Sequence, residues 1–211
     1  MSSYADLAQN VIEGAEIQVR EQVKALLTQG ENPIEIINLG LIAGMDVVGT
    51  RFKAGDMYVP EVLMSARAMS AGVEIVRPLI AETDMPSFGK VVLGTVKGDL
   101  HDIGKNLVGM LLESSGFTVI NLGVDISPEQ FVQAVKDHKP DIVALSALLT
   151  TTMTAMKETI EFLEEEGLRS KLKIIIGGAP VSQEFADEIG ADGYAPDAGS
   201  AADLCKKMVS I

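Results

Sequence analysis

Apolar positions in the first 85 residues recur every three or four residues, which is the period of an amphipathic helix. Three such stripes run through 7–27, 34–48 and 59–80. Gly30 stops the first stripe, as glycine often does at the end of a helix. The pattern predicts three helices, or four if Gly14 breaks the first, and the short connections favour an antiparallel bundle.

Beyond residue 84 the pattern changes to short apolar runs separated by helical stretches. The apolar runs lie at 91–96, 118–120, 142–145, 174–176 and, more weakly, 193–195. The helical stretches lie at 103–115, 128–137, 152–166, 182–189 and 201–208. Strands that alternate with helices predict a parallel sheet covered on both faces. Five strands in about 120 residues fit the flavodoxin-like strand order 2-1-3-4-5.

The predicted fold class is therefore α + α/β. An N-terminal four-helix bundle is followed by a flavodoxin-like (Rossmann-like) domain with a five-stranded parallel sheet. We expect 1–85 to form the helical domain, 86–89 a linker and 90–211 the sheet domain.

The composition narrows the class of protein. With 47% hydrophobic and 22% charged residues, the chain is neither disordered nor a coiled coil. No apolar run approaches the ~18 residues that a membrane span needs. The net charge of −13 argues against nucleic acid and anionic membrane surfaces as partners. No signal peptide is visible at the N-terminus, so a cytoplasmic location is expected.

The chain has few cysteine and histidine side chains that could bind a metal. Its single cysteine, Cys205, excludes a disulfide framework, and its two histidines are His101 and His138. These three side chains are too few to cage a metal ion. A metal bound here would need most of its ligands from another source.

The predicted strand order itself points to a site. In this topology ligands bind where the strand order reverses, at the carboxyl ends of strands 1 and 3. The loops at those ends are 97–104, which contains a histidine, and 146–152, which contains a row of hydroxyls. A third loop, 177–180, follows strand 4 at the same edge of the sheet.

Two other kinds of protein with this topology fit less well. A phospho-acceptor receiver domain needs a carboxylate after strand 3 and a lysine after strand 5, and neither is present. A flavin site needs a phosphate-cradling loop after strand 1, whereas that loop holds Asp99, His101 and only two glycines.

The first loop contains the pattern D-x-H-x-x-G, formed by Asp99, His101 and Gly104. Asp99 can accept a hydrogen bond from one imidazole nitrogen and so fix the tautomer of His101. The other nitrogen then offers its lone pair, which is the usual arrangement of a metal-binding histidine with a carboxylate behind it.

Three motifs together resemble a known fingerprint. After D-x-H-x-x-G, 41 residues precede the S-x-L pattern at 146–148, and 28 more precede Gly177-Gly178. This resembles the cobalamin-binding fingerprint of base-off/His-on corrinoid proteins, including the cobalamin module of methionine synthase and the methyltransferase corrinoid proteins. The stretch 96–106 strengthens the resemblance, and the helical half is similar to the methylcobalamin cap of that family, notably over 44–52.

The resemblance implies a role for individual residues. His101 would be the lower axial ligand of cobalt, with Asp99 and Thr152 completing a relay behind it. The other residues that the resemblance implies as cofactor contacts are Gly98, Leu100, Asp102, Ile103, Gly104, Ser146, Leu148, Thr150, Gly177, Gly178 and Ala198, with Phe52 and Val59 in the cap. A linker at Met85–Gly89 would be the hinge of the cap.

The resemblance also implies a function. The cofactor would be cobalamin or a related corrinoid, whose cobalt alternates between methylcob(III)alamin and cob(I)alamin. The chain would carry a methyl group from a donor-specific methyltransferase to a second methyltransferase of the tetrahydrofolate or coenzyme M type, and a reductive activator would rescue oxidised cobalt. It would be a subunit that is not catalytic alone.

Two other classes of cobalamin protein remain as alternatives. A cobalamin-sensing regulatory module would carry a DNA-binding or signalling domain, which the charge and length of this chain do not suggest. The small subunit of a cobalamin mutase lacks a helical cap of this kind. The sequence does not identify the methyl donor, which could be a methanol, methylamine, aryl methyl ether or betaine compound.

Overall fold

The computed structural model describes residues 3–81 and 86–209. These residues divide into two compact units. The first contains the residues up to Ser87 together with Ser114–Gly116, and the second contains Phe88–Glu113 and the residues from Phe117 onward. The expected hinge begins at Met85, which lies outside the described residues, and 86–89 has no helix or strand.

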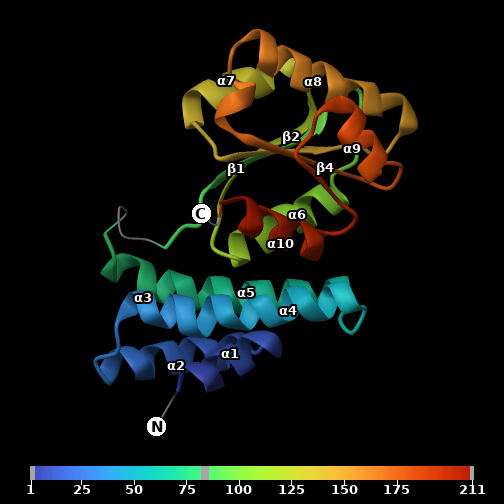
Figure 1. The fold of residues 1–211 in the computed structure, drawn as a ribbon. Coiled ribbons are helices and arrows are strands. Elements are labelled where there is room, and N and C mark those ends of the chain that lie inside the picture. Colours follow the sequence, from blue (N-terminus) through green and yellow to red (C-terminus); the bar gives the residue numbers. More distant parts are fainter. Residues whose placement is uncertain (1–2, 82–85, 210–211) are drawn as a thin grey trace. The chain divides into compact units, whose positions relative to one another are not determined.

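Within its described residues, the first unit is a bundle of four helices, which can be followed in Figure 1. The first two are α1 Tyr4–Ile12 and α2 Glu16–Thr28. The third is a continuous helix made of α3 Pro33–Glu35, the π-helical segment η1 Ile36–Ile42 and α4 Ala43–Ala54. The fourth is α5 Val59–Val76, which is followed by the 3₁₀ turn η2 Arg77–Leu79. Gly14 separates α1 from α2 and has the left-handed φ of +65°. The four-helix prediction is therefore confirmed.

Two glycines explain how closely α1 packs on the long helix. A Cβ at Gly40 would lie 2.5 Å from Cδ2 of Leu7, and one at Gly44 would lie 2.8 Å from the carbonyl oxygen of Ala8. Glycine usually weakens a helix by about 1 kcal/mol. Here the absence of side chains lets the two helices approach, with Leu7 and Val11 fully buried between them.

The long helix adds one observation to the absence of a continuous apolar run of membrane-spanning length. By length and composition alone, Pro33–Ala54 is long and apolar enough to cross a membrane, and 44% of its most apolar stretch is buried inside the structure. The core helix of a soluble protein has the same properties, so this single helix is weak evidence for a membrane span.

The second unit is a five-stranded parallel sheet in the order β2-β1-β3-β4-β5, which confirms the predicted fold class. The strands are β1 Lys90–Val96, β2 Thr118–Ile126, β3 Ile142–Ser146, β4 Lys173–Gly177 and β5 Gly193–Ala195. The helices are α6 Ile103–Ser114, α7 Pro128–His138, α8 Met153–Glu165, α9 Gln183–Ile189 and α10 Ala198–Val209, with 3₁₀ turns η4 Thr150–Thr152 and η5 Arg169–Lys171.

Side chains of the central strands alternate between two apolar layers. Val92 and Val143 face a cluster with Phe131 of α7 and with residues of α8 and α9. Val91 and Ile142 face a second cluster with residues of α6 and α10 (Figure 1). Strands buried on both faces read as continuous apolar runs, which is why they were visible in the sequence.

The predicted end of strand 2 is wrong. β2 continues to Ile126, six residues beyond Ile120, although Asn121, Gly123 and Asp125 are residue types typical of turns. Pairing with β1 persists but shifts register twice, around Gly94. This irregular second half of β2 brings polar side chains to the loop that follows β1.

Three loops meet at one edge of the sheet because their strands end in register. Thr95 of β1 pairs with Ser146 of β3, and Ser146 pairs with Gly177 of β4. The loops predicted to form a site therefore start side by side, at the carboxyl ends of adjacent strands.

Candidate functional site

The carboxylate of Asp99 is the centre of this edge. Its side chain is fully buried. Oδ1 lies 2.7 Å from Nδ1 of His101 and accepts a hydrogen bond from the backbone N–H of the same residue at 3.1 Å. The side chain of Asp99 therefore fixes both the imidazole and the main chain of His101.

The second oxygen of Asp99 binds the loop after β3. Oδ2 accepts hydrogen bonds from Oγ1 of Thr152 at 2.7 Å and from the backbone N–H groups of Leu148 at 2.7 Å and Leu149 at 3.2 Å. His101, Asp99 and Thr152 thus form a continuous hydrogen-bonded chain. The structure brings together the three side chains that the resemblance placed in a relay.

These contacts keep Asp99 ionised. Burial by itself raises the pKa of a carboxyl group, because the charged form loses its hydration. The hydrogen bonds from Thr152, from the backbone of His101 and from Leu148 outweigh that effect and hold the pKa of Asp99 well below its usual range. Asp99 is therefore a buried anion at neutral pH.

The orientation of His101 leaves one nitrogen available. With Nδ1 directed at the carboxylate, the neutral ring carries its proton there and keeps a lone pair on Nε2. Nε2 has no hydrogen-bond partner among the described residues, and half of the side chain is exposed. Thr95 is fully buried, and its hydroxyl donates to the carbonyl oxygen of His101 at 2.9 Å. This hydrogen bond connects the loop that contains His101 to the end of β1.

The surface around His101 is apolar. Leu100 and Ile103 are 72% and 85% exposed, and Leu148 and Leu149 are also substantially exposed. Gly104 has no atom within 4 Å of where its Cβ would be. Large apolar side chains in contact with water around an available imidazole nitrogen indicate a surface that a large apolar ligand covers.

The backbone conformation and the packing at position 178 both require glycine. Its φ is +134°, and a Cβ there would lie 1.8 Å from the carbonyl oxygen of Ala147. A Cβ at Gly177 would be 3.0 Å from the carbonyl oxygen of Ala195. The expectation that these glycines make room for a cofactor tail is therefore not needed to explain Gly178, which the packing of the loops already requires.

The other predicted contacts are distributed as follows. Gly98 adopts a φ of +83°, and its position is exposed, as is Asp102. Ser146 is the last residue of β3, Thr150 is the first residue of the 3₁₀ turn η4, and Ala198 is buried at the start of α10. Phe52 and Val59 belong to the helical unit, at the last turn of α4 and the first residue of α5. Their contacts with a cofactor stay a prediction.

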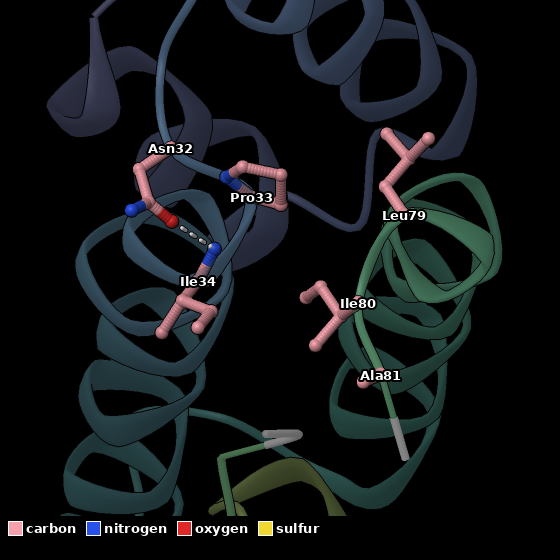
Figure 2. Close-up of a pocket in the computed structure, with 6 residues that line it drawn as sticks. All are labelled: Asn32, Pro33, Ile34, Leu79, Ile80 and Ala81. Carbon is pink, nitrogen blue, oxygen red and sulfur yellow. Dashed lines mark hydrogen bonds between the residues drawn. The ribbon is translucent and has the colours of Figure 1, made fainter. Parts of the chain in front are cut away.

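The described part of the chain does not by itself provide a metal cage. Within residues 3–81 and 86–209 no three His, Cys, Asp or Glu side chains are close enough to hold a metal ion. A pocket in the helical unit, lined by Asn32–Ile34 and Leu79–Ala81, is about 140 Å³ and lacks such ligands (Figure 2). It is smaller than the cavities that usually hold cofactors, about 300–1,000 Å³.

Comparison with known proteins identifies the family. Residues 89–203 match the family model described as B12 binding domain, and residues 4–77 match a second model with the same description. The chain belongs to the B12-binding corrinoid proteins. A corrinoid protein of Desulfitobacterium hafniense is 45% identical over 212 residues, which cover 99% of this chain and 98% of that protein. Dimethylamine corrinoid protein 1 of Methanosarcina acetivorans is 46% identical over 180 residues, or 85% and 84% of the two chains.

Solved structures agree with this assignment. A cobalamin-binding protein from Desulfitobacterium hafniense has a TM-score of 0.84 at 33% identity, with both chains covered completely. The methanol:cobalamin methyltransferase complex MtaBC from Methanosarcina barkeri has a TM-score of 0.86 at 36% identity, covering 96% of this chain and 78% of that chain.

This B12-binding protein therefore takes a corrinoid as its cofactor. The site fits such a group. A corrin ring brings four cobalt ligands of its own, so one imidazole nitrogen suffices from the protein, and the exposed Leu100 and Ile103 suit the large apolar face.

Two polar residues of the site were missed by sequence reasoning. Thr95 lies in an apolar strand, and its role depends on a backbone carbonyl six residues away. Asp125 accepts a hydrogen bond from the N–H of Gly98 at 2.7 Å. A hydroxyl at the end of an apolar run was a usable signal for Thr95, whereas the misjudged end of strand 2 concealed Asp125.

The hydroxyl of Thr152 is predicted to stabilise the fold through Asp99. Thr152→Val keeps the shape of the side chain but removes a donor to a buried carboxylate, and should lower the free energy of unfolding of the apoprotein by about 1.5–3 kcal/mol. Thr152→Ser keeps the hydroxyl and should recover most of the loss. Urea denaturation at pH 7 measures both.

The same pair of variants has a defined pH dependence. The pKa of Asp99 is lower in the folded state than the ~3.9 of an unfolded aspartate, so its contacts stabilise the protein above that value. The stabilisation is lost as pH falls through the native pKa, so the difference between the variants should be complete at neutral pH and narrow in acid. Equal stability of the two variants at pH 7 would contradict the argument.

Gly178 and Gly104 are predicted to differ in how much the stability of the apoprotein depends on glycine at each position. Gly178→Ala should lower the unfolding free energy of the apoprotein by about 2 kcal/mol or more, because its Cβ meets a backbone oxygen. Gly104→Ala meets nothing and replaces a helix glycine, so the apoprotein should gain up to about 1 kcal/mol. The melting temperatures of the two apoproteins measure this difference. Similar melting temperatures would show that the fold does not require glycine at position 178.

Proposed function

We propose that this protein is the methyl-carrying corrinoid subunit of a multi-component methyltransferase system. The observation that carries the proposal is the His101–Asp99–Thr152 chain, which presents one imidazole nitrogen at an exposed apolar surface. Relatives at 40% identity or more are named as dimethylamine and trimethylamine corrinoid proteins, which supports a role in methyl transfer.

When bound, the corrinoid supplies a cobalt that takes up and releases a methyl group while alternating between Co(I) and methyl-Co(III). In this proposal Nε2 of His101 would hold the cobalt from the protein side. Asp99 accepts the Nδ1 proton, which fixes the tautomer and makes Nε2 a better electron donor. Thr152 donates to the other carboxylate oxygen and holds Asp99 in place.

The contact between Oδ1 of Asp99 and Nδ1 of His101 is 2.7 Å long without the cofactor, so the imidazole would be oriented before it holds the metal.

The partners in the proposal are separate proteins. A donor-specific methyltransferase delivers the methyl group, and a second methyltransferase of the tetrahydrofolate or coenzyme M type removes it. A reductive activator returns oxidised cobalt to Co(I). The solved MtaBC structure is a complex of a methanol:cobalamin methyltransferase, which supports a partner of the first kind. A cytoplasmic location and a capping role for the helical unit belong to the same proposal.

The axial ligand is tested by reconstitution with cobalamin. The wild-type protein should show base-off/His-on cobalamin, with nitrogen hyperfine splitting in the EPR spectrum of Co(II). His101→Ala should lose that signature and bind cobalamin about 10-fold more weakly or worse. His138→Ala is the matched control, because His138 is exposed at the end of α7, before the amino end of β3. A His-on spectrum in His101→Ala would rule out this ligand.

The carrier role is tested by methyl transfer. The reduced holoprotein alone should not demethylate methanol or methylamines, because it is proposed to receive the methyl group from a partner. Addition of the cognate donor methyltransferase should produce the methylated cofactor, seen by its absorption spectrum. Turnover by the purified chain with free donor would overturn the carrier role, and cobalamin binding without methylation by any partner tested would favour the regulatory alternative.

A further inference from the structure

Asp125 has an unusual backbone conformation. Its φ is +55°, and among the described residues only one other residue besides glycine, Lys139, has a positive φ. A left-handed conformation is unfavourable for side chains other than that of glycine, although Asn and Asp tolerate it better than most. Such a conformation persists only where surrounding contacts maintain it, and it often marks a functional position.

The contacts of Asp125 are directed at the loop that carries the axial ligand. Its Oδ1 accepts a hydrogen bond from the N–H of Gly98 at 2.7 Å, and its own N–H donates to the carbonyl oxygen of Asp99 at 3.0 Å. The turn is closed by the N–H of Asp99, which donates to the carbonyl oxygen of Val96 at 3.1 Å. One residue of β2 therefore holds the main chain on both sides of the Gly98–Asp99 peptide.

A second residue of β2 supports the other end of the same loop. Asn121 accepts a hydrogen bond from Nζ of the buried Lys105 at 2.6 Å and donates to Oδ1 of Asn106 at 3.2 Å. Asn106 in turn donates to the carboxylate of Asp102 at 2.9 Å. β2 thus contacts the segment around His101 before and after the histidine.

We propose that Asp125 is a positioning residue for the axial ligand: through Gly98 and the main chain of Asp99, it sets the place from which the Asp99 carboxylate holds His101. The inference rests on the proposed function, since it concerns the ligand of the corrinoid. Among the described residues, Asp125 makes no hydrogen bond to the imidazole of His101 or to the carboxylate of Asp99.

The physical reason is that the carboxylate and the main chain of Asp99 are held by residues of different segments. Its carboxylate is fixed from the β3 side by Thr152 and Leu148. Its main chain is fixed from the β2 side by Asp125. Without the hydrogen bonds of Asp125, the backbone of 98–101 can rotate while the Asp99 carboxylate remains bound to Thr152 and Leu148. The distance and angle between this carboxylate and Nδ1 of His101 then change.

The test uses three substitutions of Asp125 that separate strain from hydrogen bonding. Asp125→Gly accepts the φ of +55° without strain but has no acceptor, and Asp125→Ala has neither advantage. Asp125→Asn keeps an acceptor oxygen and tolerates the left-handed conformation. Lys139→Gly is the control, because it relieves the other positive φ at the end of α7, before the opposite end of the sheet.

Cobalamin affinity, the His-on fraction of Co(II) cobalamin by EPR, and hydrogen exchange of the Gly98 amide in the apoprotein are measured for each full-length variant. Asp125→Gly and Asp125→Ala should bind cobalamin about 10-fold more weakly, with a smaller His-on fraction and faster exchange at Gly98. Asp125→Asn and Lys139→Gly should resemble the wild type. If Asp125→Ala does not fold, Asp125→Gly against Asp125→Asn gives the same comparison.

The possible failures are distinguishable. Wild-type affinity, His-on fraction and Gly98 exchange in Asp125→Gly would overturn the positioning role while leaving the proposed function intact. A wild-type protein that binds cobalamin with its benzimidazole still on the metal, or does not bind it, would overturn the proposed function and this inference with it.

Discussion

The site is organised around the burial of one negative charge. A carboxylate removed from water is stable only when hydrogen bonds replace its hydration, and Asp99 has five donors within 3.2 Å. One of them is the imidazole, three are backbone N–H groups and one is a hydroxyl. Since these donors come from the loops after β1 and β3, the anion links two adjacent strand ends and orients the histidine in the same set of contacts.

The five hydrogen bonds to the Asp99 carboxylate depend on the topology of the sheet. A parallel sheet with the order β2-β1-β3-β4-β5 places the carboxyl ends of β1 and β3 next to each other, although about 50 residues separate them along the chain. β2, on the outer side of β1, supplies contacts from the other direction through Asp125 and Asn121. The loop that carries His101 is therefore held between strands on both sides.

The sequence predicted the fold well because each layer has its own period. Buried strands read as apolar runs, helices read as stripes, and Asp99 with His101 two residues away forms a local pair. Contacts that join distant segments were harder to predict. The 2.7 Å bond from Thr152 to Asp99 was expected only from resemblance, and the contact of Asp125 with Gly98 was hidden because an Asn-Leu-Gly-Val-Asp segment resembles a loop rather than a strand.

The choice of threonine at position 152 has a consequence for the rigidity of the relay. A β-branched side chain has fewer accessible χ1 rotamers than serine. Its Cγ2 lies 3.5 Å from the place that a Cβ of Gly98 would occupy, so the methyl group packs beside the loop after β1. The hydroxyl is thereby held near the Asp99 carboxylate before any cofactor arrives, and little rotational entropy of this side chain remains to be lost on binding.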